Sequence, residues 1–196
     1  LLGGLPGVMK IYFTDRDINP EYPADGTAYA HDIITLVLNR KFREQPERIK
    51  EQLRQTIFHE AFHIRQHFSL EDGKYSALEA AIFEGCATRF EQVYTDSDPL
   101  QGRYDQTDSE TLERWYEQMS KITAEEYFDP SLETFHKWAF YDPDTGEKWK
   151  IYQTGTWIVD RILATRKLDV IDLRGVSATQ MLEWFEEIRA SEKLTQ

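Results

Sequence analysis

The chain has 196 residues, of which 40% are hydrophobic, 13% are aromatic and 30% are charged. This composition supplies enough apolar side chains for a packed core and excludes a disordered or collagen-like chain. The formal net charge of -12 at pH 7 disfavours nucleic acid and anionic membrane surfaces as partners. The single cysteine excludes an internal disulfide and a cysteine-rich zinc module. We therefore expect one soluble globular domain over residues 1–196.

The start of the chain, Leu1 to Gly4, has neither an initiator methionine nor a basic segment. We expect the chain to follow a removed signal or leader, or to begin at a truncation point. The compartment stays open, either cytoplasmic or exported, and so does the oligomeric state. No uncharged apolar run approaches the roughly 20 residues of a membrane span, so none is expected.

The first forty residues predict a small sheet. Two short runs rich in β-branched and aromatic residues, Met9–Phe13 and Ile33–Leu38, are typical of strands. They are separated by a stretch rich in turn residues, 19–26. We expect the second run to form the sheet edge along which an extended peptide could lie.

From Pro46 onward the hydrophobic pattern is helical. Proline is tolerated in the first turn of a helix, and nothing breaks this helix before Ser69. The segment Ser76 to Glu79 has the form of a capping box and opens a second helix that runs to about Tyr94. Further helices are expected at 108–122, 130–139, 147–166 and 178–190, with a turn at 142–146. The predicted fold class is α+β, mostly helical with a small N-terminal sheet.

The sequence His59-Glu60-Ala61-Phe62-His63 lies inside the first of these helices. Residues four apart share one face of a helix, so two imidazoles can bind one zinc ion while Glu60 reaches a water activated by the metal. An apolar stripe can anchor this helix in a core; it consists of Ile57, Ala61, Ile64 and Phe68. The spacing predicts His59 and His63 as metal ligands and Glu60 as catalytic base.

A catalytic zinc site needs three protein ligands and one open position. His67 is set aside because it is rotated about 80° from His59 and lies too far along the helix axis. If the two helices are antiparallel, a rise of about 1.5 Å per residue places Glu84 level with the space between the histidines. Glu79 would be too shallow and Glu91 too deep, so Glu84 is the expected third ligand.

Several residues around Glu84 carry their own expectations. Gly85 has no side chain at the point where the two helices are expected to cross closely. Because glycine is unfavourable inside a helix, its presence indicates a packing or functional reason. Cys86 points away from the face of Glu84, so we expect a small buried hydrophobe rather than a thiolate ligand.

The motif His59 to His63, followed by Glu84-Gly-Cys-Ala87, resembles the gluzincins, zinc metallopeptidases in which a glutamate on a second helix completes the metal site. The sequence looks closest to a bacterial family of Zn-dependent proteases known only as a domain of unknown function. In that family a Tyr-x-x-Gly helix follows, which Tyr152 to Gly155 matches. The resemblance covers about 26–163. It implies a zincin-like metallopeptidase domain with Zn²⁺ on His59, His63 and Glu84, and with Glu60 as base.

The sequence departs from the best-known gluzincins at Thr88, where they often carry an acidic residue that orients a zinc histidine. Another acceptor must therefore orient that ring. Tyr152 has two interpretations. Its hydroxyl could stabilise an oxyanion, or its ring could join a core stripe made of Ile151, Gly155, Ile158 and Ile162.

These observations predict a zinc metallopeptidase that acts on a peptide or protein substrate, with Glu60 and Tyr152 as catalytic residues. Two alternatives remain open. One is a non-catalytic binding domain stabilised by zinc, and the other is a helical interaction module without a metal.

Overall fold

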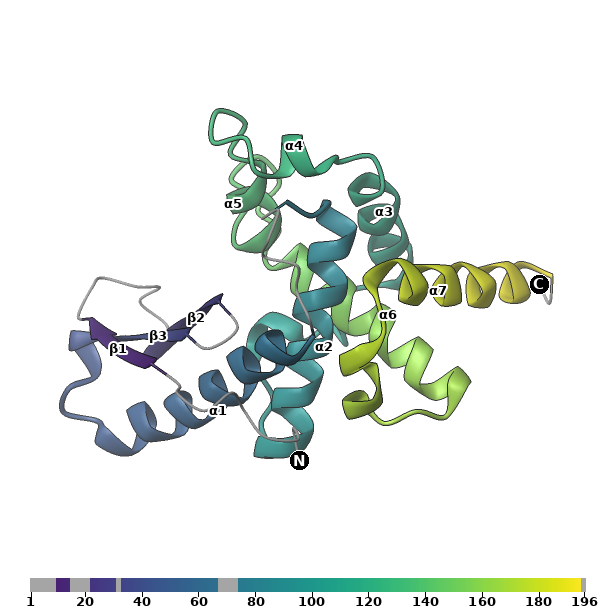
Figure 1. The fold of residues 1–196 in the computed structure, drawn as a ribbon. Helices are drawn as coiled ribbons and strands as arrows, with labels where there is room; N and C mark the ends of the chain where they lie inside the picture. The colour runs from purple at the N-terminus through teal and green to yellow at the C-terminus, as the bar shows by residue number, and fades with distance from the viewer. Residues whose placement is uncertain (1–9, 15–21, 31–32, 67–73, 195–196) are drawn as a thin grey trace.

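The computed structural model describes residues 10–14, 22–30, 33–66 and 74–194. A small sheet lies at one end and a body of helices at the other, with helix α1 between them (Figure 1). The strands are β1 (Lys10–Thr14), β2 (Ala24–Ala30) and β3 (Ile33–Leu38). The α-helices are α1 (Pro46–Arg65), α2 (Ala77–Thr95), α3 (Ser109–Met119), α4 (Ala124–Tyr127), α5 (Thr134–Ala139), α6 (Lys150–Arg166) and α7 (Ala178–Lys193). The expected mostly helical α+β class is confirmed.

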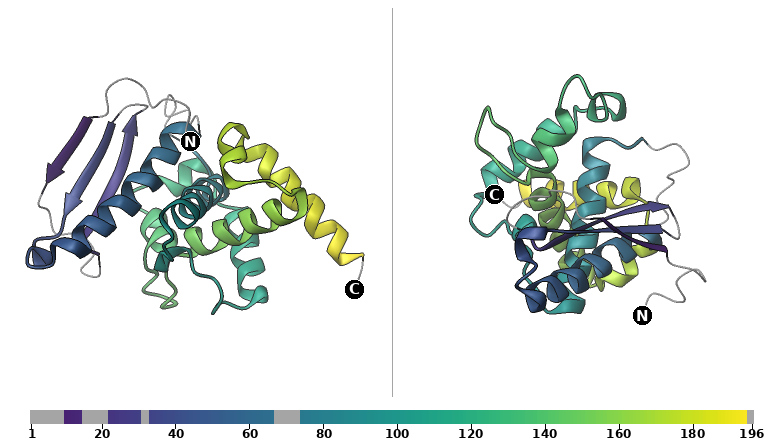
Figure 2. Two further views of the ribbon diagram at one scale, coloured as in Figure 1. Left: turned by 90° about the horizontal axis from the view of Figure 1, so that it is seen from below. Right: turned by 90° about the vertical axis from the view of Figure 1, so that its left-hand side faces the viewer.

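The sheet has the order β1-β3-β2, with β1 parallel and β2 antiparallel to β3. The expectation that 33–38 form the sheet edge is wrong, because β3 is hydrogen-bonded on both sides. The edge beside α1 is β2 (Figure 2, left). Residues 24–26 of β2 belong to the stretch 19–26 that the sequence predicts as turn, because alanine, aspartate and glycine have weak strand preference. Pairing with the strongly β-prone β3 overrides that local preference.

The sheet packs on α1 through a small apolar cluster of Ile34, Leu36 and Ile64. A side chain at Gly26 would place its Cβ 2.4 Å from Cγ2 of Thr56, so the glycine lets β2 approach α1 closely. The backbone groups of Gly26 are satisfied locally: its N–H donates to Oδ1 of Asp25, and its carbonyl accepts from Oγ1 of Thr27, both at 2.8 Å.

The helix boundaries follow local signals in most places. Helix α1 begins at Pro46 and is described to Arg65, so the expected end at Ser69 lies outside the described residues, as do Phe68 and His67. The capping box that opens α2 is present, with Ser76 accepting from the Glu79 N–H and the Glu79 carboxylate accepting in return.

Most of the later helices differ in length from the expectation. Helix α3 ends at Met119 and is followed by the separate short helix α4, while the helix expected at 130–139 is confined to α5. Helix α6 begins three residues later than expected and ends where expected, and α7 begins where expected and ends three residues later. The turn expected at 142–146 is present, and Gly146 adopts a left-handed conformation there with φ of 76°.

Helices α2 and α6 cross at two glycines without any side chain between their backbones. A Cβ on Gly85 would lie 2.2 Å from the carbonyl carbon of Gly155, and a Cβ on Gly155 would lie 1.9 Å from the carbonyl oxygen of Ala81. The helix that crosses α2 closely at Gly85 is therefore α6 and not α1, which carries the His59–His63 motif. Around it lies the main core; its fully buried members include Phe62, Phe90, Ile158, Ile162 and Phe185.

No helix within the described ranges combines the length and the apolar character needed to cross a bilayer.

Candidate metal centre

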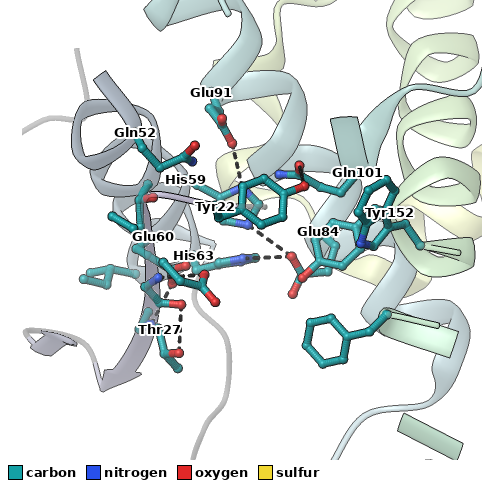
Figure 3. Close-up of a pocket in the computed structure, with 18 of the residues that line it drawn as sticks. Tyr22, Thr27, Gln52, His59, Glu60, His63, Glu84, Glu91, Gln101 and Tyr152 are labelled. Carbon is teal, nitrogen blue, oxygen red and sulfur yellow. Dashed lines mark hydrogen bonds and ion pairs between the residues drawn. The ribbon is translucent and has the colours of Figure 1, made fainter. Parts of the chain in front are cut away.

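His59 and His63 from α1 and Glu84 from α2 each direct one possible ligand atom into a common space, with all three atoms within 4.8 Å of one another. Oε2 of Glu84 is 3.1 Å from Nε2 of His59 and 3.5 Å from Nε2 of His63. In a tetrahedral zinc site with bonds of 2.0–2.2 Å, ligand atoms lie about 3.3 Å apart. The donor set and the two distances from Glu84 therefore fit a zinc ion. Figure 3 shows the Glu84 carboxylate facing both rings.

The two helices supply this arrangement by simple spacing. His59 and His63 are one turn apart on α1, and their rings meet edge to face with centroids 4.8 Å apart. Glu84 comes from the neighbouring helix at the depth expected from helix rise. Both histidines are buried, with exposed fractions of 7% and 9%.

The charges of these side chains already compensate one another. Burial lowers the pKa of His59, but its hydrogen bonds with Glu84 and Glu91 raise it more, so the pKa lies well above the ordinary value. Burial raises the pKa of Glu84, but the two histidines lower it more, so it lies below the ordinary range. A proton on the His59 ring balances the Glu84 carboxylate in the space that a cation would take, and metal binding would release it.

Glu60 points into the same space but is held by a different partner. Its Oε2 accepts a 2.6 Å hydrogen bond from the backbone N–H of Ala28, a group of β2 that the sheet leaves free. Burial raises the pKa of Glu60 above its ordinary value, although the nearby histidines and the Ala28 N–H oppose this. A carboxylate with a raised pKa is suited to accept and return a proton near neutral pH.

Glu91 supplies the acceptor that Thr88 cannot provide. Its Oε2 lies 3.2 Å from Nδ1 of His59, and the residue is only 2% exposed. Glu91 follows Glu84 by seven residues, two turns along the same face of α2. Glu91 lies too deep along α2 to be a metal ligand, and this same depth places it behind the ring of His59. Thr88 is fully buried, and its hydroxyl has no hydrogen-bond partner among the described residues.

Sequence reasoning missed Glu91 because it tested this residue only as a ligand. A signal for it was available. The i+7 spacing from Glu84 on a long helix places a second carboxylate on the face that α1 covers.

Tyr152 lines a cavity of about 310 Å³ together with the metal-centre residues. It is half-buried, and Figure 3 shows it beside Glu84 at the start of α6. Its neighbours Ile151 and Ile158 are fully buried in the core, so the apolar stripe exists without Tyr152. Burial raises the pKa of Tyr152, and Glu84 adds to this, so its hydroxyl keeps its proton and can donate a hydrogen bond. Its catalytic role stays a prediction.

Cys86 is buried, as expected, with its Sγ 3.8 Å from Sδ of Met181. Burial raises the pKa of its thiol to about 12, which does not favour a thiolate ligand.

One comparison with known proteins identifies a family. The family model described as "Predicted Zn-dependent protease (DUF2268)" matches residues 11–183. Since the match spans most of the 196 residues, the chain belongs to this family. No curated protein and no solved structure matches the chain.

The contact between Glu91 and His59 generates a prediction about metal affinity. Glu91→Ala removes the acceptor behind the ring, and loss of such a partner weakens metal binding by about 10- to 100-fold. Glu91→Gln retains an acceptor oxygen and should lose less. Competition with a chromogenic chelator measures the zinc affinity.

Thr88→Val provides the matched control, because it keeps the buried shape and removes a hydroxyl that no described residue bonds. We expect wild-type zinc affinity in this variant. Equal affinity in Glu91→Ala and the wild type would show that Glu91 does not support the metal centre.

Proposed function

We propose that this member of the family is a zinc metallopeptidase, with His59, His63 and Glu84 as metal ligands and Glu60 as general base. The observation that supports the proposal most directly is that three ligand atoms converge beside a carboxylate that is not one of them. Structural zinc sites use four protein ligands, whereas catalytic sites use three and keep one position open. Within the described residues, three potential ligands converge here. Two histidines on one helix and a glutamate on the next support our proposal of a gluzincin arrangement in a zincin-like fold.

Each polar group has a distinct task in this proposal. A bound zinc ion lowers the pKa of a water and polarises a carbonyl. Glu60, held by the Ala28 N–H, accepts the proton of the attacking water and returns it to the leaving amine. The Tyr152 hydroxyl donates to the carbonyl oxygen as negative charge develops there. Glu91 keeps the proton of His59 on Nδ1, which leaves Nε2 for the metal.

The edge strand β2 is the proposed guide for an extended peptide. The cavity is lined on one side by residues 24–28, and the N–H of Ala28 already points at Glu60. A peptide that lies along this edge, with Glu60 still bonded to Ala28, passes directly across the base and the metal ligands. This assigns to β2 the part that the sequence had suggested for 33–38.

Glu60→Gln tests the proposed base. The variant keeps the size of the side chain and an acceptor for Ala28 but removes the group that takes the proton. We expect full zinc content and a loss of peptide hydrolysis by two or more orders of magnitude. Metal analysis and cleavage of an unstructured protein such as casein measure the two quantities. Undiminished turnover would remove Glu60 from the mechanism, and zinc binding without any cleavage by the wild type would favour a non-catalytic domain.

Glu84→Ala tests the third ligand. Zinc content should fall sharply, and the melting temperature should no longer rise when zinc is added. Glu79→Ala is the control on the same helix. It removes half of a capping box and so lowers stability by about 1 kcal/mol, but the response of its melting temperature to zinc should persist. If Glu84→Ala retained wild-type zinc content, the ligand would have to be another residue.

Tyr152→Phe separates a catalytic hydroxyl from a packed ring. Phenylalanine keeps the ring, so zinc content and melting temperature should stay nearly unchanged, apart from one hydrogen bond of about 1 kcal/mol. Loss of a donor to the developing oxyanion should lower kcat about a hundredfold. Steady-state kinetics on a cleavable peptide gives the answer. A wild-type kcat would leave Tyr152 with a packing role.

A further inference from the structure

Aromatic side chains line much of the cavity. Six of its lining residues carry aromatic rings; they are Tyr22, Tyr75, Phe135, Phe140, Trp149 and Tyr152. Neither lysine nor arginine is found among the described residues that line it. Phe135 comes from α5, whereas Phe140 and Trp149 begin and end the segment that joins α5 to α6. We call these three residues the aromatic wall.

Backbone hydrogen bonds hold the two ends of this segment together. The N–H of Trp149 donates to the carbonyl of Phe140 at 2.9 Å, and an antiparallel bridge pairs Tyr141 with Lys148. Residues 140–149 thus form a closed hairpin. The hairpin places Phe140 beside the start of α6, and Phe135 contacts the Phe140 ring edge to face at 5.6 Å.

A buried ion pair anchors the hairpin to α6. Nζ of Lys150 lies 2.6 Å from Oδ2 of Asp142, and the two residues are 3% and 7% exposed. The same ammonium lies 4.2 Å from the ring centroid of Trp138. Removing one partner of such a pair leaves an uncompensated buried charge, so the pair strongly favours this one position of the hairpin.

The backbone of Trp149 is strained in this position. Its φ of 52° and ψ of 35° lie in the left-handed region, which bulky residues seldom adopt. Such strain persists where the surrounding structure requires it, and it is concentrated at functional sites. Trp149 and Tyr152 both line the cavity that holds His59, His63 and Glu84. The aromatic wall therefore continues to the metal centre.

The carboxylates of the cavity already have partners, whereas the rings do not fill it. Glu84 and Glu91 bond the histidines, Glu60 bonds Ala28, and Asp25 bonds the Gly26 N–H. Phe140, in contrast, is 40% exposed while lining a cavity. Apolar surface in a concave site with few polar groups to spare is typical of a surface that a ligand covers.

We propose that the aromatic wall binds a bulky apolar or aromatic side chain of the substrate, at or next to the scissile bond, and that Phe140 determines this preference. The inference rests on the proposed peptidase function. A cavity of about 310 Å³ holds only a few peptide residues. A substrate side chain that contacts the aromatic wall therefore belongs to a residue close to the scissile bond, which the proposed function places beside Glu60.

A set of peptides tests this side-chain preference with zinc-loaded wild-type protein. The peptides are identical except at one position, which carries Phe, Leu, Ala, Lys or Asp in turn. We expect kcat/KM for Phe and Leu to exceed that for Ala by about tenfold or more at one position. In Phe140→Ala this ratio should fall to within a few-fold, with little change in melting temperature, because the side chain is partly exposed.

Tyr141→Ala is the matched control. Tyr141 is the next residue, is 50% exposed and does not line the cavity, so this variant should keep the wild-type preference. The inference is overturned if Lys or Asp is preferred, or if Phe140→Ala keeps the wild-type ratio of Phe to Ala.

The same peptides should also be titrated calorimetrically into zinc-loaded Glu60→Gln, with and without Phe140→Ala. If Glu60→Gln binds the Phe peptide more tightly than the Ala peptide, and Phe140→Ala removes this difference, the result supports the aromatic wall. This holds even if the wild type cleaves no peptide, an outcome that would contradict only the proposed function. Equal binding of the Phe and Ala peptides, or no binding of either, overturns the inference.

Discussion

The backbones of α2 and α6 touch at Gly85 and Gly155, and the position of the whole site depends on this contact. Glu84 immediately precedes the first glycine, and Tyr152 lies three residues before the second. A contact between two backbones allows little sliding, because the carbonyl of Ala81 already occupies the space that a Cβ on Gly155 would need. Any added side chain would separate the helices and move Glu84 away from the histidines of α1. The glycines thus determine the geometry of the candidate metal centre without touching it.

Three glutamates in one cavity differ in chemistry because they differ in partners. Glu84 faces two imidazoles, which lower its pKa below the ordinary range. Glu60 faces a single backbone N–H of β2, and burial raises its pKa. Glu91 lies deeper and bonds the far nitrogen of His59. Helix spacing places one glutamate beside a histidine on α1 and two others seven residues apart on α2, and the packing of α1 against α2 and β2 gives each its partner.

The features that local sequence determines were predictable. The His-Glu-x-x-His spacing needs only one helix, the capping box at Ser76 needs only four residues, and the depth of Glu84 needs only an antiparallel helix pair. The strand β2 was not predictable in this way, because its small residues have weak strand preference and it forms by pairing with β3.

The support around the site depends on contacts that one sequence does not display. Lys150 and Asp142 look like solvated surface charges in the sequence, since such residues are seldom buried unless paired. Helical periodicity places Tyr152 next to a core stripe but does not tell which neighbour faces its ring. The contact of Glu91 with His59 likewise needs the packing of α1 on α2, although the spacing that permits it is visible.

The edge strand β2 does not present an empty row of hydrogen-bonding groups. At Gly26 the side chains of Asp25 and Thr27 already occupy the N–H and the carbonyl, and Glu60 occupies the N–H of Ala28. A strand that arrives here exchanges one hydrogen bond for another, so backbone pairing alone yields little net affinity. Another copy of the chain therefore gains little by docking its own strand on this edge.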